Sequence, residues 1–184
     1  TPYRFDDRKI AWQPFGEFPH FVFSILQVDM QQRIADVIFK FAAGQQIVLH
    51  RHKALNHTFV IQGEHRIYEE DGSLREIRPA GSHTISPASE TPHREGGGSE
   101  DVIVLFSMRP QPAELLYEIL DDNGQIVAEV TLETLNEIFQ ANRQAALRST
   151  TRMKKGTSQG ALFHIQRCAR DDETWHWIAM VFVP

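Results

Sequence analysis

The chain has 184 residues, of which 41% are hydrophobic and 23% charged, and its formal net charge is −5. This length is typical of one domain with its own hydrophobic core, and the acidic balance argues against nucleic acid as the main partner. The longest apolar runs, such as Ile178–Val183, are far shorter than the roughly 20 residues of a membrane span. One cysteine, Cys168, excludes an internal disulfide framework. Because no charged leader with an apolar stretch opens the chain, we expect a cytoplasmic protein that does not bind membranes.

The segment before residue 131 is typical of an antiparallel β-sandwich or barrel. In 33–41 the apolar side chains of Ala35, Val37, Phe39 and Phe41 alternate with other residues, which is the period of a strand. Turn residues, including the run Gly96-Gly97-Gly98, separate a series of short apolar segments. We predict strands at 21–25, 33–41, 47–49, 58–61, 66–68, 74–77, 84–86, 102–107, 116–120 and 126–130. Many short strands with such turns indicate an all-β domain over residues 1–130.

Helical periodicity appears only after the last of these strands. Apolar residues recur at three- and four-residue intervals from Leu132 to Phe139, and Thr131 is a suitable N-terminal cap. We therefore predict a C-terminal helix over 131–147. Residues 148–184 are predicted to be a basic linker and a strand-like tail, in which Trp175–Val183 adds a strand to the barrel or to a neighbouring subunit.

The histidines are the strongest candidates for chemistry. In His50-Arg51-His52 the two rings are two residues apart at the predicted end of a strand, so both project from the same face. Two imidazoles in this arrangement can converge on one metal ion. The pair alone is weak evidence, because the chain contains nine histidines.

The spacing around this pair resembles the first motif of the cupin superfamily, G-x5-H-x-H-x3-E-x6-G. Gly44, His50, His52 and Gly63 match it, and Asn56 stands where the family usually has its glutamate. This departure implies a site with fewer carboxylate ligands than the usual cupin centre.

A second cupin motif, G-x5-P-x-G-x2-H, follows along the chain. Gly81, Pro87 and His93 match it, with Ser89 in place of a glycine and one additional residue before the histidine. The resemblance covers roughly residues 34–108. It implies a jelly-roll-like, double-stranded β-helix barrel that holds one metal ion through His50, His52 and His93.

The fourth ligand of such an ion stays open at this stage. Glu69 and Glu70 follow Gly63 on the next strand, where one of them could point inward as a ligand or catalytic carboxylate; the alternative is an exposed hairpin turn. Asn56 is expected to form a hydrogen bond to a ligand rather than to bind the metal itself. His57 is a candidate ligand or proton shuttle, although a regular strand would point it to the face opposite Asn56.

Within the superfamily, the segment 56–63 and the hairpin around Asn123-Gly124 are similar to small cupins. These are grouped with 2,4'-dihydroxyacetophenone dioxygenase, acetylacetone-cleaving dioxygenase and the ChrR-type anti-sigma factors. The resemblance implies a non-haem iron(II) dioxygenase that cleaves a carbon–carbon bond in a small dicarbonyl or hydroxyketone. Iron is the expected metal, with zinc, nickel or manganese as alternatives. The apolar residues expected to line its pocket are Phe39, Phe41, Phe59, Ile85 and Phe106.

Two other functions remain open. A non-catalytic cupin would use the same histidines with zinc, as a sensor or regulator, and a metal-free isomerase would use a histidine as a base. His65 is expected on a strand surface and His83 in a structural position. We also expect a homodimer, because barrel edges are usually covered by a partner strand.

Overall fold

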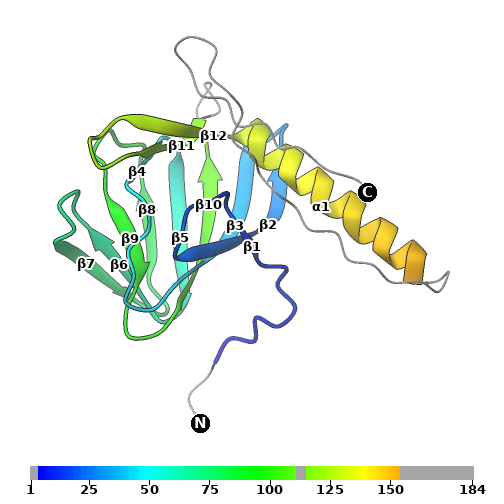
Figure 1. The fold of residues 1–184 in the computed structure, drawn as a ribbon, viewed down its shortest axis with the longest axis horizontal. Coiled ribbons are helices and arrows are strands. Elements are labelled where there is room, and N and C mark those ends of the chain that lie inside the picture. The colour runs from blue at the N-terminus through cyan, green and yellow to red at the C-terminus, as the bar shows by residue number, and fades with distance from the viewer. Residues whose placement is uncertain (1–3, 111–114, 154–184) are drawn as a thin grey trace.

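The computed structural model describes residues 4–110 and 115–153. These residues form a β-barrel with one helix at its side (Figure 1). The strands are β1 (Gln13–Pro14), β2 (Phe21–Asp29), β3 (Ile34–Phe41), β4 (His50–His52), β5 (Leu55–Gln62), β6 (Glu64–Tyr68), β7 (Leu74–Pro79), β8 (His83–Ser86), β9 (Arg94–Gly97), β10 (Val102–Arg109), β11 (Leu115–Leu120) and β12 (Ile126–Thr131). The helix is α1 (Leu132–Met153). The predicted all-β fold with a C-terminal helix is confirmed.

The strands form two walls with the core between them. A six-stranded sheet in the order β1-β2-β3-β10-β5-β8 makes one wall. Two three-stranded sheets, β12-β11-β4 and β7-β6-β9, make the other, and the backbone pairs Gln46–Gly96 and His50–His93 connect them. Phe23 and Phe106 from the first wall and Ile119 from the second belong to one buried apolar cluster. Strands that are distant in sequence lie side by side, as in a double-stranded β-helix.

The glycine run at 96–98 has a different role from the predicted turn. Gly96 and Gly97 belong to β9, and a Cβ atom at Gly96 would lie 2.0 Å from the carbonyl oxygen of Gln45. The same atom at Gly97 would lie 2.9 Å from the carbonyl oxygen of Ala42. These positions require glycine because another segment of backbone passes against the strand. The predicted strand at 47–49 is also wrong, since β4 begins only at His50.

The helix begins where the sequence predicts but ends later. Thr131 Oγ1 accepts a hydrogen bond of 3.1 Å from the backbone N–H of Thr134, which caps the first turn. Leu132 and Leu135 are buried against the barrel. The helix continues past residue 147 to Met153, because the polar residues after 147 include no glycine or proline before Gly156. No helix among the described residues is long and apolar enough to cross a membrane. The strand-like tail predicted for the end of the chain lies outside those residues.

Candidate metal centre

Two of the predicted ligands lie on β4, a strand of three residues. His50 and His52 alternate with Arg51, so both rings point into the barrel, and both are buried. Their Nε2 atoms are 3.1 Å apart. His50 Nδ1 donates a hydrogen bond of 2.9 Å to the carbonyl oxygen of Val48. Because a carbonyl only accepts, the proton of the neutral His50 ring is on Nδ1 and the lone pair of Nε2 is available to a cation.

The third histidine reaches the same point from the other small sheet. His93 pairs directly with His50, and the two residues exchange backbone hydrogen bonds of 3.1 and 3.0 Å. Directly paired residues have side chains on the same face of the sheet. The ring centroid of His93 is 4.7 Å from that of His50 and 4.8 Å from that of His52. The structure therefore brings the three predicted histidines together.

A carboxylate that the sequence analysis missed completes this group. Glu95 lies two residues after His93, so its side chain is on the same face of the chain. It is buried, and its oxygens are 3.6 Å from His50 Nε2, 3.9 Å from His52 Nε2 and 3.8 Å from His93 Nε2. One ligand atom from each of the four residues lies within 4.8 Å of the others. We call this group, His50, His52, His93 and Glu95, the donor cluster.

The protonation states of the cluster suit a cation. Burial lowers the pKa of His52 well below its ordinary value, and burial also lowers the pKa of His93, so both rings are neutral near pH 7. Burial alone would raise the pKa of Glu95. The charge of a protonated His65 and the ring nitrogens of His50, His65 and His93 beside the carboxylate outweigh burial and hold that pKa well below its usual range. Neutral imidazoles and an ionised carboxylate are the forms that bind a divalent metal, so these residues fit one.

His65 is a second residue whose role was not foreseen. The expectation that it lies on a strand surface is wrong, because its side chain is 0% exposed. Its Nε2 is 3.2 Å from a Glu95 oxygen, and its ring stacks on Phe41 with centroids 5.7 Å apart. Gly97 is its direct partner on β9, so His65 reaches Glu95 diagonally across the strand pair. His65 therefore positions the carboxylate of the donor cluster.

Asn56 contacts His52, one of the predicted metal-binding residues, as expected. It is fully buried, its Nδ2 lies 2.8 Å from His52 Nδ1, and Nδ2 donates a hydrogen bond of 3.2 Å to the carbonyl oxygen of Ala54. These contacts fix the plane of the His52 ring. Oδ1 of Asn56 has no hydrogen-bond partner among residues 4–110 and 115–153.

The predicted catalytic residues Glu69, Glu70 and His57 lie outside the donor cluster. Glu69 is in the turn after β6, 3.6 Å from Arg75, and Glu70 is exposed in the same turn. These residues occupy a hairpin turn because the chain reverses there between β6 and β7. His57 is on the other face of β5, where its ring centroid is 5.9 Å from that of His83. The carboxylate near the histidines is Glu95 instead.

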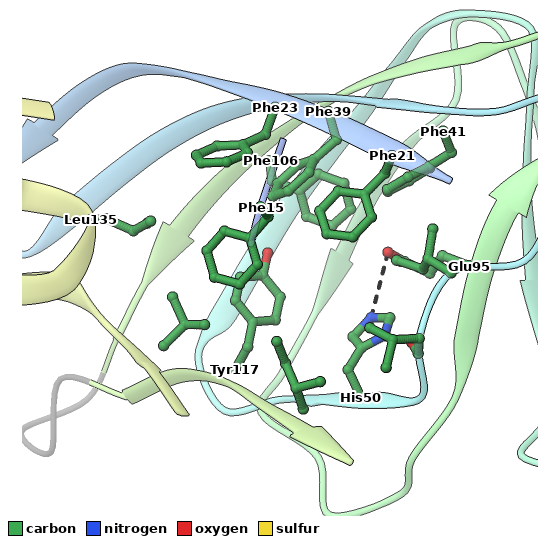
Figure 2. A pocket seen from close by; sticks show the side chains of 14 residues that line it. Phe15, Phe21, Phe23, Phe39, Phe41, His50, Glu95, Phe106, Tyr117 and Leu135 are labelled. Carbon is green, nitrogen blue, oxygen red and sulfur yellow. Dashed lines mark hydrogen bonds and ion pairs between the residues drawn. The ribbon is translucent and has the colours of Figure 1, made fainter. Parts of the chain in front are cut away.

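An apolar cavity of about 60 Å³ lies on one side of the cluster (Figure 2). His50 and Glu95 form part of its wall, together with the predicted residues Phe39, Phe41 and Phe106. The same prediction is wrong for two other residues. Phe59 and Ile85 are 43% and 58% exposed, because they point to the outer face of β5 and β8. The remaining lining residues are Phe15, Phe21, Phe23, Ile47, Val48, Tyr117, Ile119, Val130 and Leu135.

Tyr117 places a lone hydroxyl in this cavity wall. It pairs with His52 across β4 and β11, and the two rings meet edge to face with centroids 5.0 Å apart. The hydroxyl is buried, and it has no hydrogen-bond partner in the described part of the chain. Burial raises the pKa of Tyr117 well above its ordinary value, with a smaller contribution from Glu95, so the hydroxyl keeps its proton. In Figure 2 it points among the phenylalanine rings.

A second, polar cavity of about 230 Å³ also borders the cluster. Its wall contains His52, His93 and Glu95, with Asn56 beside them. The other lining residues are Thr58, Ile67, Arg75, Arg78, Ser86, Pro87, Ser89 and Thr91. The cluster therefore contributes to the walls of a polar cavity and an apolar one, and Glu95 borders both.

The sequence of this chain matches the family model of the ChrR cupin-like domain over residues 3–111. The chain belongs to this cupin family. That assignment agrees with the resemblance read from the two histidine motifs and with the double-stranded β-helix of the structure. None of the curated proteins compared with this cupin matches it.

Solved structures share the fold of this cupin at low sequence identity. An RmlC-like cupin from Ralstonia eutropha JMP134 is 19% identical, with a TM-score of 0.60, over 79% of this chain and 88% of that one. An acetylacetone dioxygenase from Acinetobacter johnsonii is 16% identical, with a TM-score of 0.58, over 77% and 91%. A protein of unknown function with a cupin-like fold, also from R. eutropha JMP134, is 17% identical, with a TM-score of 0.54, over 68% and 74%.

Proposed function

We propose that this cupin is a non-haem iron(II) dioxygenase that cleaves a carbon–carbon bond in a small dicarbonyl or hydroxyketone. The observation that carries the proposal is the buried donor cluster, which borders two cavities. Four protein ligands leave two positions of an octahedral ion free, which is the number that a bidentate chelating substrate needs. An iron(II) ion bound there would supply Lewis-acid polarisation of the substrate and reactivity toward dioxygen.

The residues of the chain have separate roles in this proposal. His50, His52, His93 and Glu95 hold the ion, and His65 and Asn56 fix the orientation of Glu95 and His52. The carboxylate of Glu95 cancels one of the two charges of the cation. The remaining charge matches the single negative charge of an enolate, the form in which a dicarbonyl chelates. The phenylalanine side chains beside His50 keep water from that side of the cluster.

The solved relative from A. johnsonii supports this choice among cupin activities. It is an acetylacetone dioxygenase, and its fold matches this cupin over most of both chains. At 16% identity the similarity concerns the fold, so the activity is carried to this chain as part of the proposal.

The test is oxygen uptake by iron-loaded protein with acetylacetone and a panel of aryl hydroxyketones. We expect substrate-dependent uptake that is lost in His93→Ala, because this variant removes one of the cluster's ligands. His83→Ala is the matched control, since His83 is on the outer face of the barrel and should leave uptake unchanged. No uptake with any member of the panel, at full iron occupancy, would contradict the proposal.

A zinc-dependent sensor is the second candidate function. The same four donors are enough to close a tetrahedral zinc shell, and the matching family model is that of the ChrR cupin-like domain. Cobalt(II) substitution separates the two functions. Intense visible absorption of a four-coordinate cobalt ion, unchanged by acetylacetone, would support the sensor. Weak absorption that changes when acetylacetone is added would support the dioxygenase.

A further inference from the structure

The polar cavity contains positive charge that the donor cluster does not explain. Arg75 and Arg78 on β7 both line it, and they lie in one wall with neutral side chains such as Thr58 and Ser86. Cationic side chains beside a metal centre do not help to bind a cation. Their presence in this wall points to an anionic group on the ligand that occupies the cavity.

The two arginines differ in how far their donors are already used. Arg78 binds the carboxylate of Glu76 through hydrogen bonds of 2.9 and 2.7 Å and donates to Thr84 Oγ1 at 3.3 Å. The nearest approach of Arg75 to Glu69 is 3.6 Å, which is longer than a hydrogen bond. Arg75 is therefore the arginine of this wall whose guanidinium can turn to an incoming anion.

Asn56 is a second polar residue of this wall, and its side-chain oxygen lacks a hydrogen-bond partner among the described residues. The side chain of Asn56 is 0% exposed. A buried acceptor without a donor costs free energy, so a hydroxyl group of a ligand would satisfy it. The wall of the cavity thus contains a cationic anchor, an unused acceptor and three members of the donor cluster: His52, His93 and Glu95.

We propose that the substrate in the polar cavity is an anion: a dicarbonyl or hydroxyketone that also carries a carboxylate. Arg75 binds the carboxylate, the chelating oxygens face the ion held by the cluster, and in a hydroxyketone Asn56 Oδ1 accepts a hydrogen bond from the hydroxyl group. This inference rests on the proposed function for the chelating part of the substrate. The inference that the substrate carries a carboxylate rests on Arg75 alone.

The test compares two probes that differ by one group. 2,4-Dioxopentanoate has a carboxylate where 2,4-pentanedione has a terminal methyl group, and both chelate a metal through two oxygens. Dissociation constants are measured by calorimetry with zinc-loaded protein, in which no turnover occurs, and the readout is the ratio of the two constants. We expect Arg75→Gln to reduce the preference for the carboxylate about tenfold, the effect of losing one charge-assisted hydrogen bond at a partly exposed site.

Two further variants test whether the change in this ratio is specific to Arg75. Arg75→Lys should retain part of the preference, because the charge remains while the planar guanidinium is lost. Arg66→Gln is the matched control, since Arg66 is on the neighbouring strand β6, pairs with Glu64 and is not part of the cavity wall. Its ratio should equal that of the unmodified protein.

An unchanged ratio in Arg75→Gln, or an equal loss in Arg66→Gln, would overturn the inference. Oxygen uptake by iron-loaded protein is measured in parallel, so that the two proposals can fail separately. A ratio that depends on Arg75 without any oxygen uptake would keep the anionic ligand and reject the dioxygenase. Oxygen uptake with 2,4-pentanedione, together with a ratio that does not depend on Arg75, would support the dioxygenase and reject the anionic ligand.

Discussion

The two cavities beside the donor cluster have opposite characters, although they share Glu95. The apolar cavity has a volume of about 60 Å³ and a wall formed mainly by phenylalanine and aliphatic side chains. The polar cavity has about 230 Å³ and a wall with two arginines and several hydroxyl groups. The difference suggests a division of tasks: the polar side binds the organic ligand, and the apolar side holds the barrel together and keeps water away from the ion.

The largest expected effect concerns stability on the apolar side. Phe106→Ala should lower the free energy of unfolding by about 3–5 kcal/mol, because it empties a buried position that packs edge to face on Phe39. Arg78→Ala in the polar wall should cost less than about 1 kcal/mol, since it removes an ion pair with a partly exposed carboxylate. Urea unfolding of both metal-free variants measures the difference. Similar losses would show that the two walls do not differ in this way.

The next effect concerns the residue that both cavities share. Glu95→Gln should weaken metal binding roughly a hundredfold, because it removes the cluster's negative charge and leaves His65 beside an amide. Competition with a chelator of known affinity measures this change. Glu64→Gln provides the control, since Glu64 is on β6 and pairs with Arg66. Stoichiometric, tight metal binding by Glu95→Gln would mean that Glu95 does not serve the centre.

A smaller effect tests whether the apolar cavity is dry. The buried hydroxyl of Tyr117 has no partner in the described residues, so Tyr117→Phe should raise the free energy of unfolding of the metal-free protein by about 1 kcal/mol. Urea unfolding again provides the measurement. A loss of stability would indicate that the hydroxyl is hydrogen-bonded, for example to water inside the cavity.

The smallest effect concerns the edge of the polar cavity. Glu69 lies 3.6 Å from Arg75 and competes with a ligand carboxylate for that guanidinium. Glu69→Gln should therefore tighten the binding of 2,4-dioxopentanoate about two- to threefold, the size expected for a partly exposed ion pair. Calorimetry with zinc-loaded protein measures it, and Glu70→Gln, in the same turn, is the control. Weaker binding in Glu69→Gln would show that Glu69 supports the anion site.

Much of the fold and three of the four members of the donor cluster could be predicted from the sequence. The alternation in 33–41 and the spacing around His50, His52 and His93 are local patterns, and the structure preserves them. Glu95 could have been found by the same two-residue rule that was applied to His50 and His52. It was missed because the glycines after it were interpreted as a turn, which hid the strand that carries it.

Other features depend on contacts between distant segments and leave no local signal. His65 shares one face of β6 with Ile67, but the sequence cannot show that this face meets Glu95 rather than solvent. The same limit applies to Phe59 and Ile85, whose apolar side chains suggested a cavity wall although they lie on the outer face. The late end of α1 differs, since the absence of glycine and proline between residue 147 and Gly156 is a local signal that the polar composition obscured.

The close passage of backbone against Gly96 and Gly97 has a consequence for ion exchange. Since β9 packs directly against a second backbone segment at these two positions, we expect Glu95 on β9 and His93 just before it to keep their places whether or not an ion is present. The ion should therefore leave and return without unfolding of the chain. Selection among metal ions would then depend on how well each ion fits a fixed arrangement of the donor cluster, because the cluster would not adjust to the ion.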